Sequence, residues 1–307
     1  AYDYARKPRR TRTYGTCLGA VPAFRILRRG EVAAATPNGS SQQSGGVLLQ
    51  AGHVNVLALF AHPDDAEFLC GGTLAHLAAW GASIHLATMT GGDCGSTILP
   101  AEKITRIRRR EAERAAALIQ ANYTCLEEKD LFVFYDRRTL AKVLELVRRV
   151  DPALVLTHSP TDYMIDHETT SRLCQSACFG AMAPNLKTGA RRPAKPPRRV
   201  PHLYYTQPFG DRDILGKAIR PSLFVDISGV LTRKEELLAC HESQQAWLRA
   251  QQEVPHPQNT MHEMAERAGR LSGLRWAEGL RQHLGQGFPQ NNLLGELLGD
   301  LVRSIEA

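Results

Sequence analysis

Three polar side chains with the chemistry of a metal site lie close together in residues 54–72, VNVLALFAHPDDAEFLCGG. His62 and Asp65 are three positions apart, and an imidazole paired with a carboxylate suits a divalent cation. Asp64 is adjacent to Asp65 and has the reach to act on a water molecule bound to such an ion. The alternative is that Asp64 and Asp65 cap the following helix, which is a common role of aspartate. A metal site needs at least one further protein ligand, so the rest of the chain decides between these interpretations.

The elements around these residues place them where ligands bind in α/β proteins. Residues 54–61 form a short apolar run with one polar member, Asn55, and this pattern predicts a parallel strand buried on both faces. Pro63 disfavours a helical conformation at His62, and a helical pattern begins at Ala66. The three polar side chains are therefore expected between the carboxyl end of a strand and the start of a helix, where open α/β sheets bind ligands.

A second group of candidate ligands follows the apolar run ALVLTH at residues 153–158, which predicts a further buried strand. The group consists of His158, Asp162, Asp166 and His167. If the two strands are neighbours, His167 completes a set with His62 and Asp65. Three such ligands with an open position describe a catalytic zinc, which lowers the pKa of bound water to about 7. Asp64 would then act as the general base. His158 is either a fourth ligand or a strand-end residue that supports the loop.

The segments HPDDAEFLCGGT and HSPTDYMIDH together resemble the LmbE-like (PIG-L) superfamily of zinc-dependent N-deacetylases. The similarity covers roughly residues 53–285 and includes RRREAERAAALI, the VDIS segment at 225–228 and the HESQ segment at 241–244. The resemblance implies a metal-dependent hydrolase that removes an acyl group, with acetyl expected, from an N-acylated amino sugar conjugate. It implies one Zn²⁺ per chain, with other divalent ions as alternatives. By the family pattern, the ligands are His62, Asp65 and His167, and the base is Asp64.

One position departs from the family pattern. Many members carry a histidine three residues before the last ligand, where it stabilises the oxyanion or protonates the leaving amine, and this chain has Met164. Asp166, which would orient that histidine, is then expected to hold His167 instead. We take His241 as the candidate for the missing group, or else as a core histidine on a helix face. The alternative to the enzyme is a catalytically impaired relative that binds a sugar conjugate.

Other residues are weaker candidates for contact with a substrate. Asp93, in the Gly-rich turn GGDCGS at residues 91–96, is a possible acceptor from a sugar hydroxyl, and Tyr163 lies in the loop before His167. The Arg108–Arg110 cluster reads as a solvated helix face from which Arg109 would reach the pocket. The basic, Pro-rich loop at 185–200 is either a rim that selects anionic substrates or an ordinary surface loop.

The alternation of strands and helices predicts one doubly wound, mostly parallel Rossmann-like sheet in a single domain at 53–307. Strands are expected at 83–90, 202–206 and 222–227, and helices at 102–121, 139–150, 231–252 and 259–283, with short strands and loops at 122–136. Residues 1–52 read as a flexible basic tail and linker, or as an organelle-targeting segment. The first strand ends in AHPDD rather than GxGxxG, which argues against a dinucleotide-binding protein.

The formal net charge of +7 does not indicate a nucleic-acid-binding body. Eight Lys or Arg against two acids lie in residues 1–31, and six with no acid lie in the 185–200 loop, so the remainder is net negative. We therefore expect no nucleic-acid partner. The expected partner is a small molecule, and the chain could also form homo-oligomers. Seven scattered cysteines and the lack of a secretory apolar segment favour a reduced, cytoplasmic protein. No apolar run approaches the roughly 18 residues of a membrane span.

Overall fold

The computed structural model describes residues 54–251 and 257–305. The tail expected at 1–52 lies outside these residues. No helix in the described ranges combines the length and apolar character needed to cross a membrane. The described chain forms an α/β fold around one eight-stranded sheet, which confirms the predicted fold class.

Five parallel strands form the half of the sheet that carries the candidate ligands. They are β1 (Asn55–Phe60), β2 (Ser83–Thr90), β3 (Asn122–Glu128), β4 (Leu154–Thr157) and β5 (His202–Thr206). The other three strands are β6 (Leu223–Asp226), β7 (Ala277–Gln282) and β8 (Val302–Ser304). The strand order is β3-β2-β1-β4-β5-β7-β6-β8, with antiparallel pairing from β5 onward. Because β1 and β4 are neighbours, their carboxyl-end loops lie side by side, as the sequence predicts.

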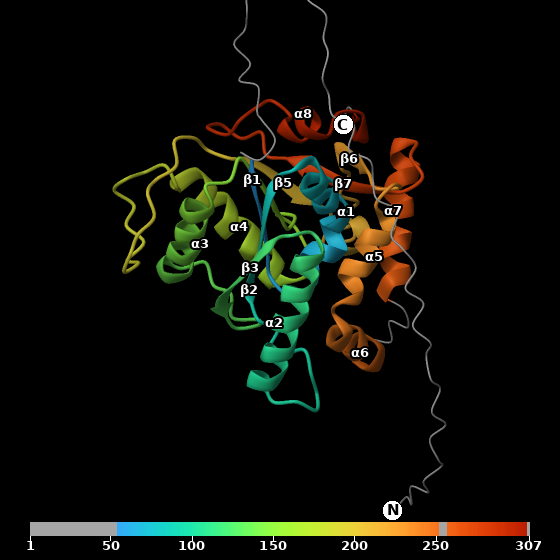
Figure 1. Ribbon diagram of the computed structural model, residues 1–307, viewed down its shortest axis with the longest axis horizontal. Helices are drawn as coiled ribbons and strands as arrows, with labels where there is room; N and C mark the ends of the chain where they lie inside the picture. The colour runs from blue at the N-terminus through green and yellow to red at the C-terminus, as the bar shows by residue number, and fades with distance from the viewer. Residues whose placement is uncertain (1–53, 252–256, 306–307) are drawn as a thin grey trace, which may run out of the picture. The chain divides into compact units, whose positions relative to one another are not determined.

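Helices cover both faces of the sheet (Figure 1). One face is packed by α1 (Asp65–Trp80), α2 (Ala101–Leu118), α5 (Leu231–Ala239), α7 (Pro257–Ser272) and α8 (Leu293–Leu298). The other is packed by α3 (Arg137–Val150) and α4 (Ile165–Gly180). Alternate residues of β1 enter the two cores, with Val56 on the α1 side and Leu57 on the α3 side. This alternation explains why the strand is apolar throughout. Cys174 and Cys178 are fully buried beside α3.

Two sequence-based helix assignments near the C-terminus are wrong. The helix expected at 259–283 ends at Ser272, and the chain continues as the central antiparallel strand β7. Gly273 has a φ of +68°, a left-handed conformation that ends helices readily. The helix expected at 231–252 is interrupted after Ala239, and α6 (Glu242–Gln251) follows. His241 therefore lies in the turn between two helices rather than on a helix face.

A buried ion pair joins the antiparallel part of the sheet to α1. Glu278 on β7 accepts hydrogen bonds from the backbone N–H groups of Gly72 and Thr73, and its carboxylate lies 2.6 Å from the Lys234 ammonium of α5. Both charged side chains are almost completely buried. A Cβ on Gly72 would lie 2.5 Å from Ile227, so glycine allows this close approach of α1.

Glu278→Gln is expected to lower the free energy of unfolding by about 3–5 kcal/mol, because it leaves the Lys234 ammonium buried without a counter-charge. Urea denaturation followed by circular dichroism measures this change. Glu266→Gln, which removes a carboxylate from an exposed pair with Arg270, serves as the control and should change stability by less than about 1 kcal/mol. Equal effects of the two substitutions would contradict the structural role of the buried pair.

Candidate metal centre

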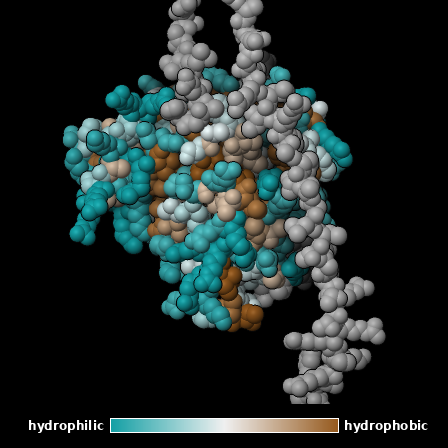
Figure 2. Space-filling view, viewed as in Figure 1, coloured by the Kyte–Doolittle hydropathy of each residue, from teal (hydrophilic) through white to brown (hydrophobic). Residues whose placement is uncertain are grey.

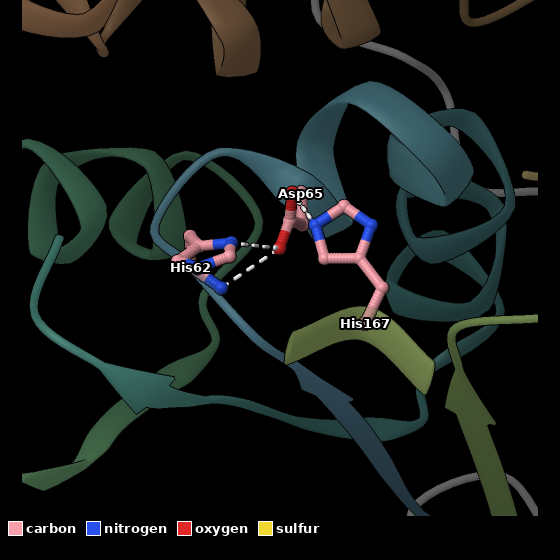
Figure 3. A group of neighbouring side chains, drawn as sticks. All are labelled: His62, Asp65 and His167. Atoms are coloured by element: carbon pink, nitrogen blue, oxygen red, sulfur yellow. Dashed lines mark hydrogen bonds and ion pairs between the residues drawn. The ribbon is translucent and has the colours of Figure 1, made fainter. Parts of the chain in front are cut away.

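His62, Asp65 and His167 meet at the carboxyl ends of β1 and β4 (Figure 3). One potential ligand atom from each lies within 4.8 Å of the others. Asp65 Oδ2 is 3.4 Å from His62 Nδ1, and Asp65 Oδ1 is 3.6 Å from His167 Nε2. The carboxylate thus lies between the two imidazoles, and all three side chains are largely buried.

The turn between β1 and α1 is shaped for this convergence rather than for helix capping. Asp64 has a φ of 97°, a conformation that is costly for a residue with a Cβ. Its side chain makes no cap hydrogen bond. The Asp65 carboxylate instead accepts the backbone N–H of His62 at 2.7 Å. The capping interpretation therefore does not describe this turn.

Each candidate imidazole ligand is held from behind by a carboxylate. Asp166 Oδ2 lies 3.2 Å from His62 Nε2 and also accepts the backbone N–H of Leu131 at 2.7 Å. Asp162 Oδ1 lies 3.0 Å from His167 Nδ1. Such partners fix the orientation of metal-binding imidazoles and raise their basicity. The sequence analysis paired Asp166 with His167, but in the structure Asp166 contacts His62 and the loop after β3.

The electrostatics of the centre favour a bound cation. Burial opposes a charge on His62, but Asp166 and Asp65 outweigh it and raise the pKa of this imidazole to about 10. Burial also opposes the charge on Asp65, yet His167 and His158 hold the pKa of its carboxyl well below its usual range. Two histidines and a carboxylate are the donors of catalytic zinc sites. The residues present therefore fit a divalent ion, with metal and proton competing for the imidazoles.

His158 supports the centre from the end of β4. Its ring stacks on that of His167, with centroids 3.9 Å apart, and its Nε2 accepts the backbone N–H of Ala61. The same atom is 3.1 Å from Asp65 Oδ2. Burial and the neighbouring His167 lower the pKa of His158 to about 4, so the ring is neutral at pH 7. This placement resembles the supporting role, although His158 also forms a possible ligand group with Asp162 and His167.

Asp64 faces a buried arginine that the sequence assigned to solvent. Arg108 donates to the Pro63 carbonyl at 2.7 Å and to Asp64 Oδ1 at 3.2 Å. Burial raises the pKa of Asp64 to about 6 although Arg108 acts to lower it. Arg109, which the sequence analysis expected to reach the pocket, forms an exposed ion pair with Glu127. The apolar positions of α2, which include Ile104, Ala112 and Ala115, share a face with Arg108 and would have indicated its burial.

His241 is fully buried beside the first turn of α1. Its Nε2 lies 3.2 Å from Glu67 Oε1, and Ser243 just after it donates twice to the buried Glu111 of α2. Burial opposes a charge on His241, but Glu67 and Asp64 outweigh both burial and Arg108, and they raise the pKa of the imidazole. His241 is therefore close enough to Asp64 for their charges to interact.

Comparisons with known proteins agree with this geometry. The family described as GlcNAc-PI de-N-acetylase, PIG-L, matches residues 57–178, which include all three candidate ligands. Residues 57–178 are therefore similar to the PIG-L (LmbE-like) family. The matched segment contains both the HPDD turn and the loop before His167.

The PIG-L relatives include two kinds of enzyme. The 4-oxalmesaconate hydratase of Pseudomonas putida is 28% identical over 62% of this chain and 74% of its own length. The diacetylchitobiose deacetylase of Thermococcus kodakarensis is 27% identical over 74% of this chain and 82% of its own. The solved N,N'-diacetylchitobiose deacetylase of Pyrococcus horikoshii shares the fold, with a TM-score of 0.63 and 23% identity over 75% of this chain and 83% of that one.

The Gly-rich turn at residues 91–96 packs against the buried Arg108. Gly92 has a φ of +72°, and a Cβ there would lie 2.2 Å from the Arg108 guanidinium. A Cβ on Gly95 would also crowd Arg108, at 2.8 Å. Asp93 accepts the backbone N–H of Asp130 at 2.9 Å. The turn therefore holds Arg108 against Asp64. Through Asp93 it also hydrogen-bonds the loop that follows β3.

The remaining candidates lie in two different places. Tyr163 stands at the mouth of the centre, with its ring edge-on to His167 at 5.4 Å, and Met164 precedes the first turn of α4. The loop at 185–200 lies far from the mouth, because it precedes β5 at the amino-terminal edge of the sheet. Thr188 and Ala194 donate to Glu145 on α3, and the surface around them is mostly hydrophilic (Figure 2). The interpretation of this loop as a rim of the site is therefore wrong.

Asp166→Asn is expected to weaken metal affinity by about 10–100-fold, because it removes the charge that holds the His62 imidazole. Competition with a metal-binding chromophore measures the dissociation constant. Glu127→Gln removes a carboxylate of the exposed pair with Arg109 and provides the matched control. Unchanged affinity in Asp166→Asn would show that the carboxylate behind His62 has no role in metal binding.

Proposed function

We propose that this protein is a zinc-dependent N-deacetylase that removes an acetyl group from the amine of an N-acylated amino sugar conjugate. The observation that carries the proposal is that Asp64 adjoins the group formed by His62, Asp65 and His167, and that the charges of Asp64 and the buried His241 interact. Deacetylase relatives provide independent support for this kind of reaction. The seven scattered cysteines favour the reducing conditions of the cytoplasm as the place of this reaction.

His62, Asp65 and His167 would hold the ion, which would supply a Lewis acid and lower the pKa of water toward neutrality. Asp64 accepts the proton of the attacking water, and Arg108 holds the Asp64 carboxylate in place through Oδ1. Asp166 and Asp162 keep the two ligand imidazoles oriented. Burial of these groups limits water access and strengthens their electrostatic interactions.

His241 takes the role that Met164 cannot perform. A thioether has no proton to donate, whereas Glu67 and Asp64 raise the pKa of His241 and so favour its protonated form. Protonated His241 then donates to the developing oxyanion or to the leaving amine. This assignment gives amide cleavage both of the proton transfers that it needs.

Met164 and the hydratase relative together favour a second candidate, the addition of water to a carbon–carbon double bond. Hydration uses an activated water and a base but expels no amine, so it does not need the histidine that Met164 replaces. A third candidate, a binding protein without turnover, is less well supported because Asp64 and the three ligands are all present.

Amine release from a panel of N-acetylglucosamine derivatives tests the proposal, with 4-oxalmesaconate included for the hydratase alternative. Chelated protein restored with zinc should release amine, and Asp64→Asn should not. Loss of 4-oxalmesaconate absorbance without amine release would establish the hydratase candidate instead. Stoichiometric zinc with neither reaction would favour the binding protein, and Met164→His would then test whether the missing histidine is the cause.

A further inference from the structure

Large apolar side chains surround the mouth of the metal centre and are exposed to solvent. We call them the apolar rim: Leu131, Phe132, Phe134, Tyr163, Ile165 and Phe209. Each is between 47% and 61% exposed. They come from the segments that directly follow β3, β4 and β5, with Ile165 as the first residue of α4, so they share the carboxyl-end edge of the sheet with the candidate ligands. Exposed apolar groups of this size usually mark a binding surface.

The Leu131 part of the apolar rim is hydrogen-bonded to a residue of the metal centre. The backbone N–H of Leu131 donates to Asp166, the carboxylate behind His62. Leu131 has a φ of +65°, which is rare and costly for a residue with a bulky side chain. The preceding Asp130 accepts the hydroxyl of Thr90 and the backbone N–H of Cys94. These bonds hold the loop in a strained conformation that keeps its apolar side chains at the mouth.

The Tyr163 part of the apolar rim contacts the candidate ligand His167. The Tyr163 ring lies edge-on to His167 at 5.4 Å, and Phe209 lies 5.9 Å from Tyr163. Phe209 is in turn 6.0 Å from Phe68 of α1. Aromatic surface therefore continues from the His167 imidazole to Phe68 of α1. The reacting bond of a bound substrate would lie beside this apolar surface.

We infer that the apolar rim is a subsite for an alkyl or aryl group carried by the substrate beside its N-acyl amino sugar. This inference rests on the proposed function. The occupant has to leave and return with each turnover, because a surface that encloses the mouth cannot stay covered while substrates enter. A reversible substrate group meets this condition, and a permanent partner does not. Burial of its apolar surface supplies the binding energy.

The test compares the methyl and octyl β-glycosides of N-acetylglucosamine, with the octyl compound below its micelle concentration. The zinc-loaded protein should show a KM at least about tenfold lower for the octyl glycoside, since burial of several methylenes contributes that much. Phe132→Ser combined with Phe134→Ser should reduce this selectivity ratio toward one. Leu271→Ser, which removes an equally exposed side chain from α7, should leave the ratio unchanged.

Calorimetric binding of the octyl glycoside to Asp64→Asn provides a second measurement without turnover, and the thermal unfolding midpoint confirms that each variant is folded. Equal KM values and equal affinities for the two glycosides would overturn the subsite while leaving the deacetylase intact. Turnover of neither glycoside would contradict the proposed function. The relative affinities of the two glycosides for Asp64→Asn would then show whether the apolar rim is a subsite.

Two other occupants give different results and would also overturn the inference. If the apolar rim joins two copies of the chain, sedimentation will show that the double serine variant dissociates an oligomer, and glycoside selectivity will be absent. If the rim contacts membranes, wild type will co-sediment with phosphatidylcholine vesicles, the double variant will not, and the two glycosides will again have equal KM values.

Discussion

Asp64→Asn is expected to lower kcat by about 1000-fold, because the amide cannot accept a proton from water. Asp64 contributes no atom to the group formed by His62, Asp65 and His167, so bound metal should remain near the wild-type amount. Steady-state rates and metal content, measured on the same preparation, test both statements.

Asp65→Asn is the matched control, since it changes the neighbouring aspartate in the same way. It removes the charge between the two imidazoles and should lose metal as well as activity. Loss of metal from Asp64→Asn, or wild-type rates in that variant, would contradict the assignment of Asp64 as the base.

His241→Gln is expected to lower kcat/KM by about 100-fold, the usual effect of removing one donor to a developing oxyanion. The pH dependence distinguishes this role from a structural one. Glu67 and Asp64 raise the pKa of His241 above its ordinary value of 6.5, and the protonated form is the donor. Wild-type kcat/KM should therefore be sustained below the raised pKa and fall as the pH increases through it.

The variant should lack this alkaline decline in kcat/KM, because glutamine does not titrate. Glu67→Gln should shift the decline to lower pH, since it removes the carboxylate that lies 3.2 Å from His241. A wild-type profile in both variants would show that His241 is only a core residue.

Local sequence patterns were sufficient to predict the core of the site. The apolar run before His62 and the second run before His158 each form a parallel strand, and the two strands pair directly. Parallel neighbours bring their carboxyl-end loops together, which brings His167 to Asp65. Each strand and the turn that follows it are determined by a short stretch of residues, so they can be predicted from the sequence alone.

The interactions that the sequence did not reveal depend on packing between distant segments. Arg108 is buried because the glycines at 92 and 95 leave space for its guanidinium, and charge alone suggested a solvated position. Asp166 contacts His62 rather than its neighbour His167, and its carboxylate also accepts the backbone N–H of Leu131 from the loop after β3. Strand β7 was missed because a helical pattern continues to Ser272, and only its pairing with β5 and β6 identifies the strand.

The most direct test of the central claim is a titration of metal-free protein with zinc, in which bound ion and amine release are measured on the same sample. We predict that activity will rise in proportion to bound zinc and reach its maximum at one ion per chain, and that His62→Ala will show neither binding nor activity. Full activity in the chelated protein, or activity that does not follow occupancy of this site, would contradict the claim that His62, Asp65 and His167 form the catalytic metal centre.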